Sequence, residues 1–75
     1  MTTYRGIAIA LGSAVDGAEL ERMAELLLSA AADLEMQAED EIEQGKKRII
    51  ARRAERLGGL GLAIEAELEK AKVSP

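Results

Sequence analysis

The chain has 75 residues, a formal net charge of −4 and no cysteine. A chain this short buries only about 60% of the surface it exposes when unfolded, so it forms one small domain with a limited core. The missing cysteines exclude disulfides, thiolate metal sites and cysteine nucleophiles, and they fit a reducing compartment, so we expect a cytoplasmic protein. Fourteen residues are alanine. Because burying alanine gives little stability, we expect the chain to form homo-oligomers.

Residues 1–15 form a short N-terminal segment whose pattern fits two structures. Ile7 and Leu11 share one face of a helix, but Ile7, Ile9 and Leu11 also alternate as in a strand. We favour a short helix that ends at Gly12, because alanines separate these residues. The apolar run is too short to cross a bilayer, so we expect no membrane segment.

Residues 16–73 have the pattern of an all-α domain. Asp16 followed by Glu19 is typical of a helix start. Large apolar residues then recur at intervals of three, four or seven, which predicts one stripe for pairing with a second helix. The predicted helix-pairing interface consists of Leu20, Met23, Leu27, Leu34, Ile42, Ile49, Leu57, Ile64 and Leu68. Three glycines at 58, 59 and 61 predict a break of the helix at 58–61.

The sign of the charge reverses near Gly45. Residues 16–43 include ten acidic residues and one basic residue, whereas residues 46–56 include six basic residues and one acidic residue. Reflecting the chain about the bond after Gly45 sets the row Glu35, Glu39 and Glu43 against the row Arg56, Arg52 and Arg48. The same reflection lays Ala30 opposite Gly61. An antiparallel neighbour therefore turns two rows of like charge into attractive pairs.

Two connectivities satisfy this reflection. One is an antiparallel helical hairpin that turns at 44–47, and the other is a long helix that pairs antiparallel with a second copy. We favour the hairpin, because Gly45 suits a helix end and a short chain needs local packing. Leu26, Leu28 and Met36 lie off the main stripe. This second apolar surface predicts that two hairpins associate in a four-helix or coiled-coil-like dimer.

The sequence contains no pattern that predicts catalysis. The segment from Gly12 to Gly17 has the glycine spacing of a phosphate-binding loop, but Ala18 and Glu19 stand where that loop needs lysine and serine or threonine. The chain has no histidine, so it lacks the base of a conventional nucleophilic triad and the usual nitrogen ligand of a bundle metal site. We therefore expect no enzyme, no metal site and no cofactor.

The basic stretch 46–56 is the best candidate for a binding surface. Its cations are Lys46, Lys47, Arg48, Arg52, Arg53 and Arg56. They suit phosphates or an acidic protein surface, although no aromatic side chain accompanies them for base stacking and we expect the acidic row to neutralise them. The sequence favours a small non-catalytic protein–protein interaction module, acting as an adaptor, assembly factor or inhibitor and pairing with itself and another protein. A nucleic-acid-associated factor and a structural component of a larger assembly are the alternatives.

Overall fold

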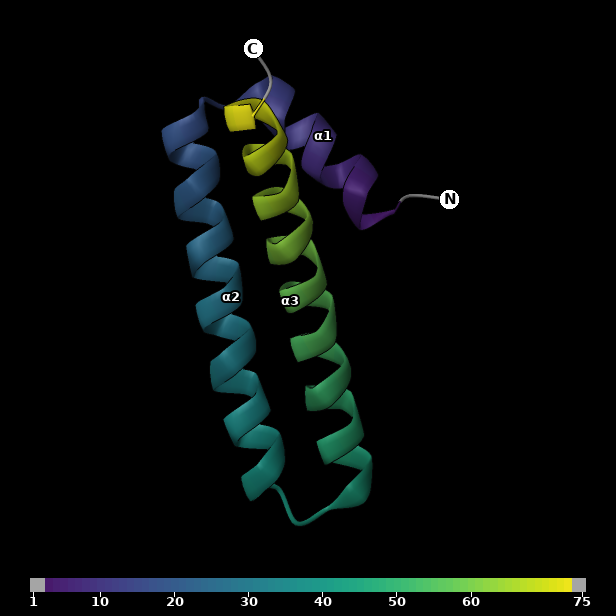
Figure 1. Ribbon diagram of the computed structural model, residues 1–75. Coiled ribbons are helices and arrows are strands. Elements are labelled where there is room, and N and C mark those ends of the chain that lie inside the picture. Colours follow the sequence, from purple (N-terminus) through teal and green to yellow (C-terminus); the bar gives the residue numbers. More distant parts are fainter. Residues whose placement is uncertain (1–2, 74–75) are drawn as a thin grey trace.

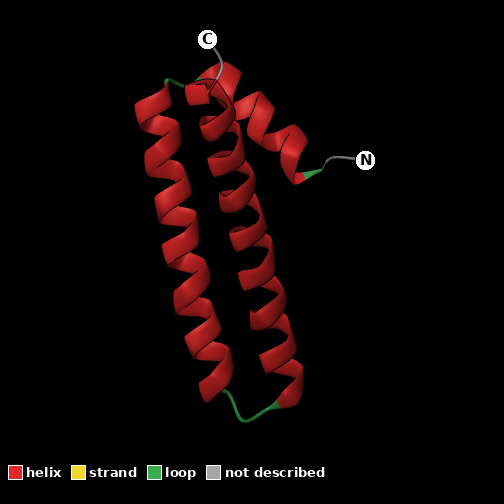
Figure 2. Cartoon of the chain, viewed as in Figure 1, coloured by secondary structure: helices red, strands yellow, loops and turns green. Residues whose placement is uncertain are grey.

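The computed structural model describes residues 3–73, which form three α-helices and no strand. α1 spans Tyr4–Ala14, α2 spans Gly17–Asp40 and α3 spans Gln44–Val73. α2 and α3 lie antiparallel as a hairpin, and α1 packs beside the C-terminal half of α3 (Figure 1). Figure 2 shows the two short loops that join the helices. The predicted all-α fold is confirmed, and the N-terminal segment is a helix.

Side-chain caps fix the starts of the first two helices. The Thr3 Oγ1 accepts a hydrogen bond from the Gly6 N–H at 3.0 Å, and the Asp16 Oδ1 accepts one from the Glu19 N–H at 2.8 Å. Each cap satisfies a backbone donor that the first helical turn leaves without a partner. The predicted helix start at Asp16 is therefore confirmed. The predicted end at Gly12 is wrong, because α1 continues through this glycine to residue 14.

The core lies in the half of the molecule that α1 covers, which we call the closed half (residues 3–28 and 58–73). Ala8, Leu20, Ala24 and Ile64 are buried there in one cluster. The partly buried residues around this cluster are Leu11, Val15, Leu27, Leu60, Ala63 and Leu68. All three helices contribute to the cluster, so the closed half is a small three-helix bundle.

The rest of the hairpin, residues 29–57, forms an open half that α1 does not reach. Its buried residues are alanines only, namely Ala31, Ala38 and Ala54. Several large apolar side chains in this half point outward, because Met36 is 64% exposed and Ile49 is 55% exposed. Leu34, Ile50 and Leu57 are half-buried. The two helices therefore approach closely here but bury little apolar area.

The chain turns at residues 41–43. The sequence predicted a turn at 44–47, and that prediction is wrong. Glu41 has an extended backbone, its N–H donates to the Ala38 carbonyl at 3.3 Å, and its carboxylate accepts from the Glu43 N–H at 3.2 Å. The Glu43 carbonyl then accepts from the Lys47 N–H at 2.9 Å. Since these bonds form the turn without a residue at positive φ, Gly45 is not needed to end a helix and lies inside α3.

The predicted glycine break at 58–61 is also wrong, because α3 is continuous through it. A Cβ added to Gly59 would lie 2.8 Å from the Tyr4 ring, and one added to Gly61 would lie 2.9 Å from the Leu28 Cγ. These glycines let the Tyr4 ring and α2 approach the α3 backbone more closely than alanine permits. Each costs about 1 kcal/mol of helix propensity, which the closer packing offsets.

Candidate interaction surface

The pairing of α2 with α3 in the structure is shifted by two residues from the pairing that reflection about Gly45 predicts. The reflection placed Ala30 opposite Gly61, whereas Gly61 lies against Leu28. The turn at 41–43 precedes the assumed centre of reflection at Gly45, which accounts for the direction of the shift. Consequently the predicted ion pairs between the acidic row of α2 and the arginine row of α3 do not form. Among the side chains described, those of residues 3–71, no ion pair joins these two helices.

The predicted helix-pairing residues fall into three groups. Leu20 and Ile64 are buried, while Met23, Leu27, Leu34, Leu57 and Leu68 are half-buried. Ile42 and Ile49 do not pair α2 with α3. Ile42 is 93% exposed because the turn removes it from α2, and Ile49 faces away from α2 with the arginines around it.

Five of the side chains on α3 in the open half line one shallow hollow. They are Arg48, Ile49, Arg52, Arg53 and Arg56, which we call the arginine surface. Their spacing of three or four residues places them on one side of the helix. All five are exposed. An apolar side chain is therefore surrounded by four guanidinium groups.

The arginine surface is not neutralised by ion pairs within the described chain. The three ion pairs among residues 3–73 join Arg5 to Glu67 at 3.7 Å, Lys70 to Glu67 at 3.5 Å and Lys46 to Glu43 at 3.5 Å. None involves an arginine of the arginine surface. Of the six predicted contact residues, Lys46 thus pairs locally, Lys47 is half-buried, and the four arginines keep their charge available.

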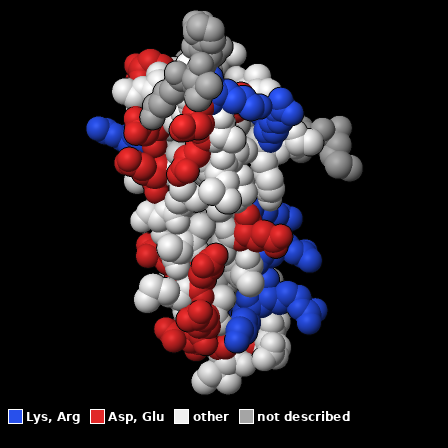
Figure 3. Space-filling view, in the orientation of Figure 1, with Lys and Arg blue, Asp and Glu red and all other residues white. Residues whose placement is uncertain are grey.

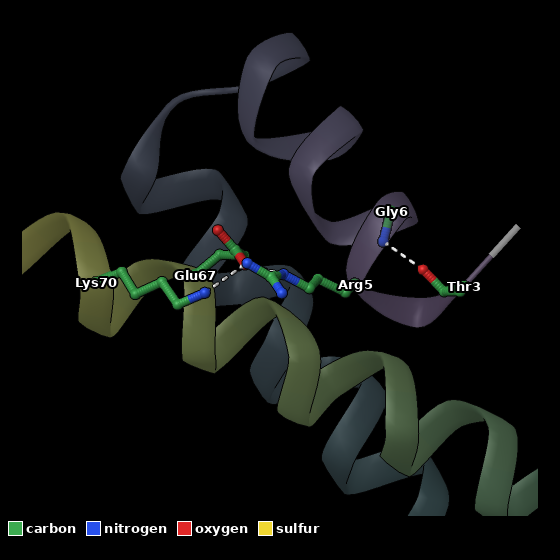
Figure 4. Close-up of polar contacts among 5 residues, drawn as sticks. All are labelled: Thr3, Arg5, Gly6, Glu67 and Lys70. Carbon is green, nitrogen blue, oxygen red and sulfur yellow. Dashed lines mark hydrogen bonds and ion pairs between the residues drawn. The ribbon is translucent and has the colours of Figure 1, made fainter.

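The arginine surface continues the face of α3 on which α1 lies. Counting back from Glu67 in steps of three or four passes Ala63, Gly59, Arg56 and Arg52. In the closed half α1 covers this face in two places. The Tyr4 ring lies over Gly59, and Arg5 forms an ion pair with Glu67, which Figure 4 shows. In the open half the same face is uncovered.

A second surface, on α2, has the opposite charge. Leu26, Asp33, Met36 and Asp40 follow one another at intervals of seven, three and four residues, so they share one face, which we call the acidic surface. Leu26 and Met36 are each 64% exposed. Neither aspartate takes part in an ion pair among residues 3–73. Figure 3 shows the wider separation, with acidic side chains over α2 and basic ones along the open half of α3.

A third cluster, which the sequence pattern did not predict, consists of glutamates. Glu21, Glu25, Glu65 and Glu69 line a hollow in the closed half. The described part of the chain contains no group of three or more acidic residues placed to hold a metal ion.

None of the helices, as far as they are described, is long and apolar enough to cross a membrane.

Comparison with known protein families, with curated proteins and with solved structures finds no match for this chain. The surface chemistry of the helices is therefore the basis for a functional assignment.

Proposed function

We propose that the chain is a small non-catalytic helical protein–protein interaction module, which acts as an adaptor, assembly factor or inhibitor of a partner protein. The arginine surface is the observation that supports this proposal. Four guanidinium groups surround Ile49, which is 55% exposed, and none of them forms an ion pair among residues 3–73. Arginine is enriched in protein interfaces, where it binds carboxylates through two parallel hydrogen bonds. The surface therefore suits an acidic partner with an apolar contact at its centre.

A nucleic-acid-associated factor is the second candidate, and the free arginines favour it. Arg48, Arg52 and Arg56 form a row about 12 Å long at 1.5 Å rise per residue, which suits contacts to phosphates. Two features favour the protein partner instead. Ile49 stands among the arginines where base stacking needs an aromatic ring, and α2 presents an acidic surface that repels a phosphate backbone.

Affinity capture from the cells of origin tests the proposal. The baits are the wild type, an Arg52→Glu/Arg56→Glu variant and an Arg22→Glu/Lys70→Glu control, which changes the net charge by the same amount outside the arginine surface. We expect the wild type and the control to form a stoichiometric complex with the same protein, and the arginine variant to lose it. Retention of that protein by the arginine variant would contradict the proposal.

Titration with duplex DNA and RNA at low salt distinguishes the nucleic-acid-associated factor from the protein–protein interaction module. Binding that requires Arg52 and Arg56 and weakens steeply with added salt would favour the nucleic-acid-associated factor. Loss of the protein complex without any nucleic-acid binding would favour the interaction module.

A further inference from the structure

We infer that the arginine surface binds an acidic amphipathic helix of a partner protein, which packs along the open half of α3 as α1 packs along the closed half. The inference rests on the proposed function and names the partner of the same site. Three observations support it: the length of α3 that α1 leaves uncovered, the reversal of charge between the two halves of one face of α3, and two partly exposed apolar side chains near the ends of the arginine surface.

One face of α3 already receives a helix. In the closed half α1 packs on this face (Figure 1), and its first residue, Tyr4, lies over Gly59. In the described chain the same face is uncovered from residue 44 to residue 58, a length of about 21 Å at 1.5 Å rise per residue. A helix of about four turns therefore fits beyond the start of α1 without displacing it.

A helix is the form of partner that suits this face. The N–H and carbonyl groups of α3 are bonded within the helix, so they cannot pair with those of an extended segment. An extended segment that lay on α3 would have backbone groups that the contact separates from water and leaves without partners. A helix satisfies its own backbone and contacts α3 through side chains alone.

The charge of the partner helix follows from a comparison with α1. In the closed half the cation is on the added helix and the anion is on α3, because Arg5 of α1 pairs with Glu67 at 3.7 Å. In the open half the cations are on α3, and none of the four arginines forms an ion pair among the side chains described. The added helix therefore has to supply carboxylates, each of which an arginine can bind through two parallel hydrogen bonds.

Two apolar side chains define the length of the contact. Ile49 is 55% exposed near one end of the arginine surface, and Tyr4, with its ring over Gly59, is 41% exposed beyond the other end. Positions 49 and 59 are about 15 Å apart along α3, with three of the arginines between them. On a helix, residues i, i+4, i+7 and i+11 share one face and span about 16.5 Å. We therefore expect apolar residues at i and i+11 of the partner helix and carboxylates at i+4 and i+7.

NMR titration of the isotope-labelled chain with synthetic peptides tests the inference. The probe is a capped peptide of about 14 residues, with leucine at i and i+11 and glutamate at i+4 and i+7 among alanines and glutamines, which favour a helix. One control peptide has the glutamates moved to i+2 and i+9, on the opposite face. A second control has proline at i+6, which breaks the helix and keeps every charge.

We expect the probe to bind with a dissociation constant below about 1 mM. It should shift the amide signals of residues 48–59 and of Tyr4, and leave those of α2 near Met36 in place. Both control peptides should bind at least about tenfold more weakly, because one presents no carboxylate to the arginines and the other cannot lie along α3 as a helix.

Variants of the chain test the same contact from the other side. We expect Arg53→Glu/Arg56→Glu to weaken binding of the probe at least about tenfold and Ile49→Ala to weaken it at least about threefold. The control Arg22→Glu/Lys70→Glu changes the net charge by the same amount outside the arginine surface and should bind the probe as the wild type does. Circular dichroism checks that the variants fold. Should the arginine variant not fold, Ile49→Ala leaves every charge in place and still tests the contact.

Four results would overturn the inference. They are no binding of the probe at about 1 mM, equal binding of the probe and either control peptide, unchanged binding by Ile49→Ala, and a dimer of the chain alone that Arg53→Glu/Arg56→Glu dissociates, since a second copy would then cover the surface. Light scattering detects such a dimer. If the probe does not bind but the Arg52→Glu/Arg56→Glu bait loses its captured protein, only this inference fails. If that bait keeps its protein, the proposed function fails.

Discussion

The closed and open halves of this molecule are built from the same two helices, yet they differ in what they bury. In the closed half, α1 covers the hairpin and large side chains such as Leu20 and Ile64 form the core. In the open half, Ala31, Ala38 and Ala54 are the buried residues, and Met36 and Ile49 are more than half exposed. The difference indicates that the closed half is the stable unit of the fold and that the open half presents exposed apolar and charged side chains.

The small residues between α2 and α3 explain part of this difference. The buried alanines Ala24, Ala31, Ala38 and Ala54 let the two helices approach closely, but alanine buries too little area to stabilise a helix pair alone. The fully buried large side chains, such as Ile64, lie where α1 adds a third helix. In the open half, which α1 does not reach, the large apolar side chains are at most half-buried.

The largest contrast is expected between two isoleucines of α3. Ile64 is fully buried and Ile49 is 55% exposed. We expect Ile64→Ala to lower the free energy of unfolding by about 2–5 kcal/mol, because it removes buried area and leaves a cavity. Ile49→Ala should change it by less than about 0.5 kcal/mol at concentrations where the chain is monomeric. Urea unfolding followed by circular dichroism measures both, and equal losses would contradict the difference between the halves.

Alanine substitutions at two glycines of α3 are expected to change the stability in opposite directions, by smaller amounts. A Cβ on Gly61 would lie 2.9 Å from the Leu28 Cγ and 3.4 Å from the Ala24 carbonyl oxygen, whereas a Cβ on Gly45 meets nothing within 4 Å. We expect Gly61→Ala to destabilise the chain by about 1–2 kcal/mol, because overpacking outweighs the gain in helix propensity. Gly45→Ala should stabilise it by about 0.4–1 kcal/mol. Thermal unfolding midpoints should move in opposite directions. A higher midpoint for Gly61→Ala would show that α2 and α3 are not packed tightly there.

The smallest effect is expected where α1 is held on α3. Arg5 and Glu67 pair at 3.7 Å, and the arginine side chain is 72% exposed, so the pair contributes at most about 1 kcal/mol. We expect Glu67→Gln to change the global unfolding free energy little and to accelerate amide hydrogen exchange in α1, while exchange near Ile49 stays the same. Equal acceleration in both halves would mean that α1 stabilises the open half as well.

The sequence was sufficient to predict helices and antiparallel pairing, because the spacing of Leu20, Leu27 and Ile64 reflects local geometry. It misplaced the turn, because Gly45 suggested a helix end while Glu41 and Glu43 form the turn through backbone and carboxylate bonds. Because of this error, the residue predicted to lie opposite Gly61 is two positions away from the one that lies there.

The shifted register explains what the sequence analysis missed in the candidate site. The reflection predicted that the acidic row would neutralise the arginines, but those ion pairs do not form in the described chain. The glycines at 58–61 were interpreted as a break, because their contacts with Tyr4 and Leu28 depend on tertiary packing that composition does not reveal.

Hydrogen exchange along α3 tests most directly the claim that the closed half is the stable unit of the fold. We expect amides near Ile64, which is fully buried, to exchange only through global unfolding, and amides of residues 49–56 to exchange faster through local opening of α3. Equal protection of the two stretches would contradict the account.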